Sequence, residues 1–307
     1  MLLVKKKILI TGSNGLLGQK LVLSLRDNYE VMATSIGVCR MNDKSGFAYQ
    51  DLNVTNEQAV RKIVLGFRPD AIINTAAMTN VDACEDDQDA CDNLNVFAVQ
   101  YLADVCAELG AHLVHISTDF IFDGEDGPYT EEDQANPLSY YGLSKWKSEQ
   151  ILQKHSCDWA ILRTIIVYGT ADNLSRENIV LWGRVALKKG NPLNIIDDQF
   201  RSPTLAEDLA QACVIAVEKR AKGVYNVSGK DIMSILEMVE RMADFYGCDK
   251  SIINRISTAT LNQKAKRPLK TGFILEKSIK QLAYQPHSFE EGLAIVEQQI
   301  LEQENNN

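Results

Sequence analysis

A tyrosine and a lysine four positions apart are the strongest chemical signal in this sequence of 307 residues. Tyr141 and Lys145 stand in the run YGLSK, where helical spacing would place both side chains on one face. A nearby ammonium favours phenolate, so we expect Lys145 to lower the pKa of Tyr141 and make it a general acid or base. A surface tyrosine and lysine on an amphipathic helix would show the same spacing, so the pair alone decides nothing.

Thr118 strengthens the catalytic interpretation. It directly follows the apolar run HLVHIS, which predicts a strand, and it precedes the helix expected to carry Tyr141 and Lys145. Ligands of open α/β sheets bind at the carboxyl ends of the strands, where a hydroxyl can hydrogen-bond a reacting oxygen. We therefore predict that Thr118, Tyr141 and Lys145 form a catalytic group for hydride chemistry on a ketone or hydroxyl.

A glycine-rich segment after the first expected strand predicts a dinucleotide site. Its spacing is GxxGxxG, which brings backbone N–H groups and a helix N-terminus to a pyrophosphate. An ordinary glycine-rich turn between a strand and a helix would look the same in isolation. The residues expected to bind the cofactor here are Gly12, Ser13, Asn14, Gly15, Leu16, Leu17 and Gly18.

The end of the second expected strand bears on the choice of cofactor. Enzymes that bind NAD usually place an acidic residue there to hold the ribose hydroxyls. In this chain the strand ends in Ala33-Thr34-Ser35, without an acidic residue. Ser35 and Arg40 are candidates for binding a 2′-phosphate, although Arg40 fits a solvated loop equally well. We expect NADPH or NADH as the cofactor, with the balance towards NADPH.

Alternating short apolar runs and helical patterns position these residues. Strands are expected at Lys7–Thr11, Glu30–Thr34, Asp70–Thr75, His112–Ser117 and Trp159–Arg163, with helices between them. One of these helices is expected to run unbroken over Asp89–Leu109. The alternation predicts a Rossmann-type, doubly wound parallel α/β sheet. We assign an NAD(P)-binding domain to residues 1–170 and a smaller α/β substrate-binding region, partly interleaved with the end of the sheet, to residues 171–307.

Composition narrows the classes of partner. The formal net charge is -9, which disfavours nucleic acid or an anionic membrane surface as the main partner. The seven cysteines form no CxxC pair and do not cluster with histidines, so we expect no metal site and no disulfide framework. No apolar stretch approaches the roughly 20 residues of a membrane helix, and the N-terminus lacks a signal-peptide pattern. A cytoplasmic location is the expectation.

Several collinear stretches together resemble one enzyme family. They are TGSNGLLG, DLNV, NTAAMTNVDACE, ISTDFIFDG, PLSYYGLSK, LRTIIVYG and DQFRSPT, with a weaker match at RPLKTGF. The chain resembles the extended short-chain dehydrogenase/reductase family, and within it the dTDP-4-dehydrorhamnose reductase group. The resemblance implies NAD(P)H-dependent reduction of the 4-keto group of a nucleotide-linked deoxysugar, as in dTDP-L-rhamnose biosynthesis, with Tyr141 as general acid. A homodimer is one assembly that it allows.

The resemblance also implies roles for residues outside the glycine loop. Asp51 and Leu52 would lie against adenine, although Asp51 also suits a helix entry. Ala76 and Ala77 would flank the cofactor. Asp119 would lie near the sugar, although it also suits a turn.

A nucleotide diphosphate sugar needs further groups in the second half of the chain. The resemblance implies a loop with Gln199, Arg201 and Thr204 for this purpose. Arg184 and Arg267 are added because a guanidinium binds phosphate oxygens in pairs. Trp182 is added for packing against the sugar or base, with a core position as its alternative. Arg201 has a surface ion pair as its alternative.

Three positions depart from the reductase pattern. Phe120 and Met78 stand where tyrosine is usual, and Ile166 stands where tryptophan is frequent. A sugar-nucleotide 4,6-dehydratase would need a glutamate in place of Phe120, which cannot move a proton, so that activity is rejected. A 4-epimerase remains open. So does an NADP-binding regulatory subunit resembling the methionine adenosyltransferase β subunit, because a binding protein can retain the catalytic residues.

Overall fold

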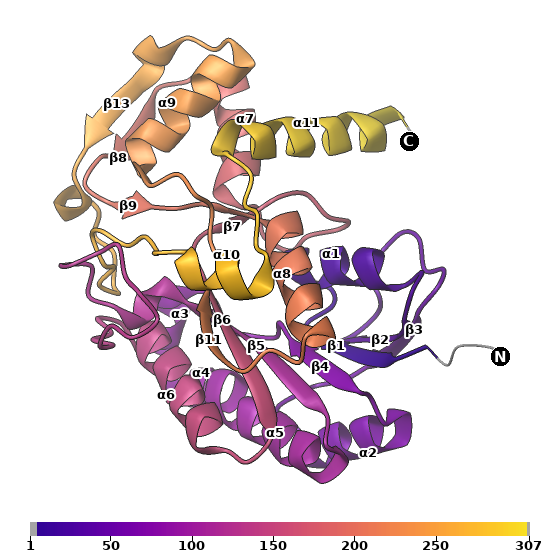
Figure 1. Ribbon diagram of the computed structural model, residues 1–307. Coiled ribbons are helices and arrows are strands. Elements are labelled where there is room, and N and C mark those ends of the chain that lie inside the picture. The colour runs from indigo at the N-terminus through magenta and orange to yellow at the C-terminus, as the bar shows by residue number, and fades with distance from the viewer. Residues whose placement is uncertain (1–4, 306–307) are drawn as a thin grey trace.

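The computed structural model describes residues 5–305 and has a seven-stranded parallel sheet at its centre (Figure 1). The strand order is β3-β2-β1-β4-β5-β6-β11, so the chain moves outward in both directions from β1 and β4. The strands are β1 (Lys7–Thr11), β2 (Glu30–Ser35), β3 (Ala48–Asp51), β4 (Ala71–Asn74), β5 (His112–Thr118), β6 (Asp158–Thr164) and β11 (Gly223–Asn226). This order confirms the prediction of a Rossmann-type fold.

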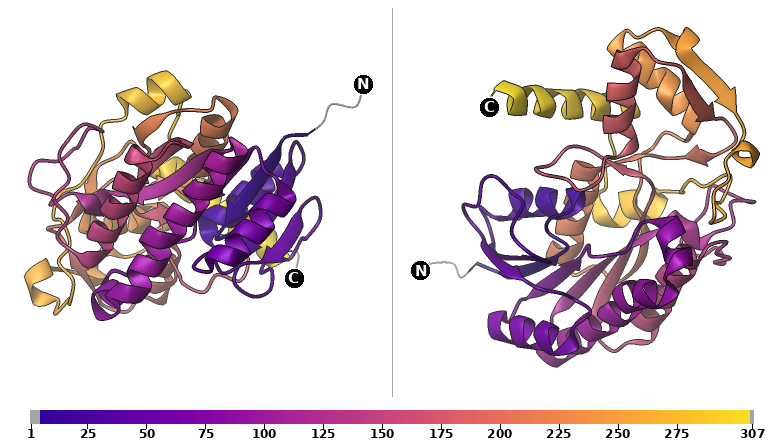
Figure 2. Two further views of the ribbon diagram at one scale, coloured as in Figure 1. Left: turned by 90° about the horizontal axis from the view of Figure 1, so that it is seen from below. Right: turned by 180° about the vertical axis from the view of Figure 1, so that it is seen from behind.

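Helices cover both faces of the sheet (Figure 2). One face carries α1 (Leu16–Leu25) and α8 (Ala206–Glu218); the other carries α2 (Glu57–Phe67), α5 (Ala98–Leu109) and α6 (Tyr140–Lys154). Alternate residues of β1 enter the two resulting cores: Ile8 and Ile10 join the first, and Leu9 joins the second. Burial on both faces explains why the central strands are almost continuously apolar.

The segment expected as one helix over 89–109 is divided. It contains α4 (Gln88–Asp92), a π-helical turn (Asn93–Phe97) and α5. A π turn inserts one extra residue and rotates its side chains relative to a regular helix. Here it directs the amide of Asn95 at the backbone of Met78. The expected unbroken helix was therefore wrong, because a hydrogen bond to the loop after β4 outweighs regular helical geometry.

The C-terminal part forms a second layer beyond the carboxyl ends of the strands (Figure 1). Its elements are α7 (Ile179–Lys189), β8 (Leu193–Ile196), α9 (Ile235–Tyr246), β13 (Ile253–Ile256) and α11 (Phe289–Asn305). They enclose a separate apolar core. However, α8 and β11 return to the main sheet from the same part of the chain. The division after residue 170 stays a proposal, and residues 1–4 and 306–307 lie outside the description.

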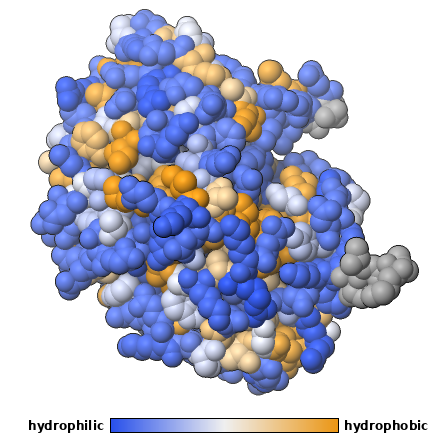
Figure 3. All heavy atoms as spheres, in the orientation of Figure 1, coloured by the Kyte–Doolittle hydropathy of each residue, from blue (hydrophilic) through white to orange (hydrophobic). Residues whose placement is uncertain are grey.

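The surface is mainly polar. Figure 3 shows one face on which hydrophilic side chains predominate and apolar ones form small groups. Within residues 5–305, no helix combines the length and the apolar character needed to cross a bilayer. Apolar side chains are instead concentrated in the clusters on either side of the sheet and in the C-terminal layer.

A buried ion pair joins α6 to the sheet. The Arg163 guanidinium on β6 donates from both Nε and Nη2 to the Glu149 carboxylate, which also accepts from Ser117 on β5. The side chains of Arg163 and Glu149 are 2% and 0% exposed. Loss of one partner would leave the other charge buried and uncompensated.

We predict that Glu149→Ala lowers the free energy of unfolding by about 3–5 kcal/mol, the cost of stranding a buried charge. Glu108→Ala is the control, because the ion pair of Glu108 with Arg61 is solvent-exposed on both sides and should be worth no more than about 1 kcal/mol. Urea denaturation of both variants measures the difference. Equal losses in the two variants would contradict the buried pair's role.

Candidate functional site

A close contact seats the first turn of α6 on the end of β5. A side chain at Gly142 would overlap the carbonyl oxygen of Phe120 and would also crowd Pro137. The Ser139 hydroxyl caps this turn by accepting a hydrogen bond from the Gly142 amide at 3.2 Å. Glycine at position 142 therefore lets Tyr141 approach the residues that follow β5.

Thr118 and Tyr141 meet at this point. The Tyr141 phenol lies near enough to the Thr118 hydroxyl for Thr118 to lower its pKa, and the Tyr141 ring packs edge-on against Phe120 with ring centroids 5.7 Å apart. The Thr118 hydroxyl also lies 3.1 Å from a carboxylate oxygen of Asp119. Tyr141 stays partly exposed, whereas Thr118 and Asp119 are buried. The Tyr141 side chain is thus packed on Phe120 and lies beside the Thr118 and Asp119 side chains.

The electrostatics at Tyr141 differ from the expectation. Burial raises the pKa of Tyr141 above its usual value, the hydrogen bond with Thr118 lowers it, and the neighbouring Asp119 carboxylate raises it again. The expected lowering by Lys145 was wrong for this state, because the amine points to the sheet. Its Nζ donates to the carbonyl oxygen of Ile116 at 2.7 Å and lies 3.0 Å from Nε2 of His115.

Lys145 is almost fully enclosed. Its side chain is 2% exposed, and burial lowers its pKa to about 8 against the opposing effect of the Glu149 carboxylate. A lysine that titrates near neutral pH can change charge during a reaction cycle. Tyr141 and Lys145 therefore lie one turn apart on α6, with the Tyr141 ring against Phe120 and the Lys145 amine against the Ile116 carbonyl of β5.

Two further polar residues beside this group were missed by the sequence analysis. His115 contacts Lys145, and Asn95 donates to the hydroxyl of Ser144 at 3.0 Å while accepting from the Met78 amide at 2.8 Å. The signal for His115 was a polar residue within a buried apolar strand. Asn95 gave no comparable signal, because its orientation depends on the π-helical turn.

The glycine loop closes tightly against β4. Gly12 has φ +66°, and a Cβ there would lie 2.8 Å from the Ala76 amide nitrogen. A Cβ at Gly18 would overlap the carbonyl oxygen of Gly12. The buried Ser13 hydroxyl has no hydrogen-bond partner in the protein. Close backbone approach and an unsatisfied buried donor beside a helix N-terminus fit a pyrophosphate.

Asn14 organises the loop that follows β2. Its amide donates to the Val38 carbonyl at 2.9 Å and accepts from the Arg40 amide at 2.9 Å. Asp51 accepts from the Gly37 amide at 2.8 Å, so its carboxylate also stabilises this loop. A hollow of about 410 Å³ lies beside the loop. Its lining residues are Val38, Cys39, Arg40, Met41, Asn42, Lys44 and Asn173.

The remaining residues expected at the cofactor lie along the same edge of the sheet. Ser35 is the last residue of β2 and its carbonyl accepts from the Leu52 amide at 3.0 Å. Leu52 is buried in the core. Ala76 and Ala77 follow β4 and stay partly exposed. The sheet order thus brings these positions next to the glycine loop.

Arg201 is held by backbone carbonyls. It is 2% exposed and donates to the carbonyl oxygens of Phe200, Pro268 and Leu269 at 2.7, 2.6 and 3.1 Å. Its Nη2 also donates to Gln199, whose amide donates to Thr258. These contacts join the 199–201 segment to the 268–271 segment.

Asp119 joins the same network. Its Oδ2 accepts from the Thr271 hydroxyl at 2.5 Å and lies 3.7 Å from Nε of Arg201. Burial raises the pKa of Asp119, while the guanidinium opposes that shift. Asp119, Gln199 and Arg201 therefore lie together beside the Tyr141 group, with Thr204 next to Thr164 at the end of β6.

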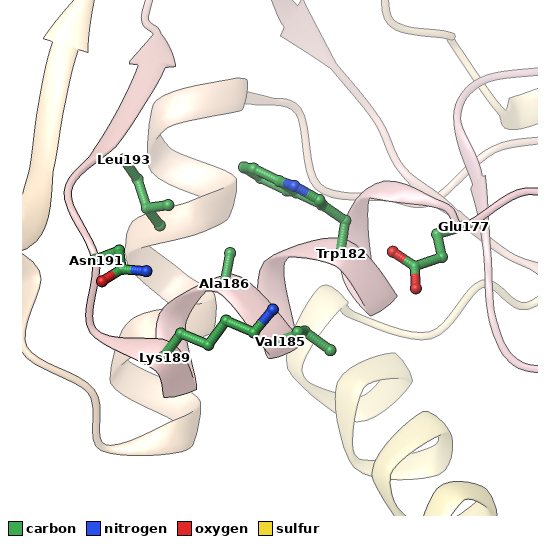
Figure 4. Close-up of a pocket in the computed structure, with 7 residues that line it drawn as sticks. All are labelled: Glu177, Trp182, Val185, Ala186, Lys189, Asn191 and Leu193. Atoms are coloured by element: carbon green, nitrogen blue, oxygen red, sulfur yellow. The ribbon is translucent and has the colours of Figure 1, made fainter.

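The other expected substrate residues are further apart. Arg267 binds Asp82 on α3 (Val81–Asp86), with the shorter contact at 2.8 Å. Arg184 on α7 donates twice to Glu297 on α11. Trp182 is 40% exposed and lies along α7 over a shallow pocket in the C-terminal layer (Figure 4). The structure does not bring Arg184 and Trp182 to the Tyr141 group.

The three departures from the reductase pattern cluster near the site. Phe120 packs on Tyr141 and lies under the Arg201 guanidinium at 5.8 Å. Met78 is fixed by Asn95. Ile166 has φ +29°, an unusual value for a β-branched residue, and packs against the cluster around Phe122. These substitutions alter the surroundings of Tyr141 and leave its contact with Thr118 intact.

Comparisons with known proteins agree with this geometry. A dTDP-4-dehydrorhamnose reductase from Aggregatibacter actinomycetemcomitans is 32% identical over 94% of this chain and 97% of its own length. The methionine adenosyltransferase 2 subunit beta of Bos taurus is 32% identical over 86% of this chain and 78% of its own. The crystal structure of a dTDP-4-dehydrorhamnose reductase from Bacillus anthracis in complex with NADP superposes with a TM-score of 0.82 at 28% identity, covering 95% of this chain and 98% of that one.

The family model of the RmlD substrate binding domain matches residues 6–301. The reductase relatives and the NADP complex agree with the prediction of an NAD(P)-dependent oxidoreductase of the reductase type. A match over nearly the whole chain leaves no large segment outside the family pattern. The chain belongs to the RmlD substrate binding domain family, within the extended short-chain dehydrogenase/reductases.

Proposed function

We propose that this chain reduces the 4-keto group of a nucleotide-linked deoxysugar with NADPH, as dTDP-4-dehydrorhamnose reductases do. The observation that carries the proposal is the convergence of Thr118, at the end of β5, and Tyr141, in the first turn of α6, where Tyr141 is partly exposed and Thr118 lowers its pKa. A phenol and a hydroxyl that converge from two elements suit a carbonyl oxygen that must be oriented and protonated.

The residues of the glycine loop fit a dinucleotide. The cradle of Gly12 and Gly18 and the unpartnered Ser13 hydroxyl would hold its pyrophosphate. Arg40 and Lys44 at the hollow beside β2 would attract a 2′-phosphate. Ala76 and Ala77 would border the cofactor, and Lys145 would reach its nicotinamide ribose. Bound NADPH supplies the hydride.

Proton delivery falls to the protein. The Thr118 hydroxyl orients the carbonyl oxygen, and Tyr141 Oη–H donates the proton that turns the ketone into an alcohol. Because burial raises the pKa of Tyr141, the phenol stays protonated before hydride transfer, as a donor must. Solvent then restores the proton to the phenolate that remains. Asp119, Gln199 and Arg201 shape the sugar side of the site.

A second candidate function is an NADP-binding regulatory subunit. The bovine β subunit and the bacterial reductase are each 32% identical to this chain, so sequence identity does not favour the reductase over the regulatory subunit. It predicts cofactor binding and a partner protein without turnover of a sugar. An epimerase stays a third alternative, and a homodimer and a cytoplasmic location remain predictions.

We predict that the chain binds NADPH at least as tightly as NADH, because β2 ends without a carboxylate. Arg40→Ala should weaken NADPH binding by about tenfold, the equivalent of about 1.4 kcal/mol, and leave NADH binding unchanged. Arg61→Ala, an exposed arginine on α2, is the control. Fluorescence titration measures both cofactors. A tenfold preference of the unaltered protein for NADH would overturn the assignment.

Tyr141→Phe removes the proton donor and keeps the ring. We expect kcat to fall by at least the ~100-fold attributed to general acid catalysis, with the Kd for NADPH within about twofold. Tyr140→Phe is a matched control, since the neighbouring phenol binds Asp92 and Lys147 on the outer side of the helix. Wild-type turnover in Tyr141→Phe, or an equal loss in Tyr140→Phe, would contradict the role of Tyr141.

The activity itself is tested with a panel of nucleotide-linked 4-ketosugars. We expect NADPH oxidation with a dTDP-linked 4-keto-6-deoxysugar and formation of the corresponding alcohol, identified by mass spectrometry. A parallel pull-down uses a methionine adenosyltransferase catalytic subunit. Formation of that complex without oxidation of NADPH by any ketosugar would replace the reductase with the regulatory subunit.

A further inference from the structure

A line of buried polar side chains crosses the sheet beneath Lys145, and proton delivery by Tyr141 does not use it. Thr11, Asn74 and His115 occupy directly paired positions on β1, β4 and β5. The Thr11 hydroxyl donates to Asn74 Oδ1 at 2.6 Å, and Asn74 Nδ2 lies 3.1 Å from His115 Nδ1. His115 Nε2 lies 3.0 Å from Lys145 Nζ. The register of the sheet therefore ends this line at the lysine amine.

The donors and acceptors in this line suit an uncharged amine. Because Asn74 Nδ2 donates to His115 Nδ1, the ring proton belongs on Nε2, which faces Lys145 Nζ and the Ser148 hydroxyl. Nε2–H can donate to a neutral amine but opposes an ammonium. When Lys145 is protonated, a half-turn of the Asn74 side-chain amide would exchange the positions of its oxygen and nitrogen.

That second arrangement suits the ammonium. His115 Nδ1–H would donate to the Asn74 oxygen, the bare Nε2 would accept from the Lys145 ammonium, and the Thr11 hydroxyl would serve as acceptor for Asn74. No charge moves onto the imidazole in either state. Complete burial, together with the nearby ammonium, holds the pKa of His115 well below its usual range, which agrees with a ring that remains neutral throughout.

We propose that His115 is the positioning residue of Lys145, and that its tautomer exchange with Asn74 keeps one hydrogen bond to the amine in both protonation states. The amine then stays in place while its proton leaves and returns. The hydrogen bond itself does not depend on the proposed function, whereas its effect on turnover rests on that function.

Other charged or titratable groups also face the Lys145 amine. Glu149 lies one turn further along α6 and is paired with Arg163 of β6, and Tyr141 lies one turn before. Cys91 of α4 raises the pKa of Lys145, because a thiolate there would attract the ammonium. None of these reaches His115 Nε2, which contacts only Lys145 and Ser148 within the described residues. A test must therefore separate His115 from the general effect of burial.

The first experiment uses the unaltered protein without cofactor. The 15N shifts of the His115 ring are followed by NMR from pH 6 to 10, and the 13Cε signal of Lys145 is followed in the same range. We expect the two to change with one midpoint, near the lysine pKa of about 8, because the tautomer follows the amine. A His115 signal that stays constant while Lys145 titrates would overturn the proposal.

The second experiment replaces the ring. His115→Phe should lower the proton affinity of Lys145 by about tenfold, since a hydrogen bond to an ammonium is worth more than one to a neutral amine. His115→Gln, which places an amide near the Nε2 position, should recover most of that affinity. His112→Phe is the matched control: His112 lies on the same strand, is 1% exposed and contacts the Ala221 carbonyl instead. An unchanged Lys145 in His115→Phe, or an equal change in His112→Phe, refutes the role of His115.

Kinetics then connect the hydrogen bond to the reaction. In His115→Phe, the fall of kcat at alkaline pH should begin about one pH unit lower, which corresponds to the tenfold loss of proton affinity at Lys145. KM for the ketosugar should stay within about twofold. If His115→Phe shifts the Lys145 pKa but the unaltered protein turns over no ketosugar, the reductase proposal is refuted and the positioning of Lys145 by His115 is retained. Turnover with an unshifted pH profile and an unshifted lysine would refute the positioning role and leave the reductase standing.

Discussion

The contact between Gly142 and the Phe120 carbonyl is the constraint on which the site depends. Any larger side chain would lift the first turn of α6 from the end of β5. The approach of Tyr141 to Thr118 requires this close contact, and so does the placement of Lys145 against the Ile116 carbonyl one turn later. Gly142 thus allows α6 to place Tyr141 beside Thr118 and to enclose the amine of Lys145.

The parallel sheet supplies the second half of that arrangement. All of its carboxyl ends lie on one edge, so the glycine loop after β1, the Ala76 backbone after β4 and Thr118 at the end of β5 become neighbours. The same register aligns Thr11, Asn74 and His115 as a polar line inside an otherwise apolar layer. Buried polar groups are costly unless fully paired, which makes such a line sensitive to each of its members.

The sequence was informative where the signal is local. Strand alternation, the glycine spacing and the Tyr141–Lys145 interval predicted the fold and the positions that meet at the sheet edge. It failed where partners are distant: the lowered pKa expected for Tyr141 assumed an amine beside it, but Lys145 turns to a histidine 30 residues earlier. The short, exposed β3 and the π-helical turn around Asn95 were also missed, because neither has an apolar period of its own.

The three arginines expected to bind a diphosphate differ in how firmly their present partners hold them. Arg201 donates to three carbonyls while 2% exposed, so releasing it would strand buried groups. Arg184 joins α7 to α11 through Glu297. Arg267 binds Asp82, whose side chain is 40% exposed, and an ion pair at the surface is worth only about 0–1 kcal/mol. A phosphate oxygen could replace the Asp82 carboxylate at little cost. Of the three, Arg267 therefore stays our candidate for binding an anionic substrate. Four residues later in the same segment, Thr271 donates to Asp119, the neighbour of Thr118.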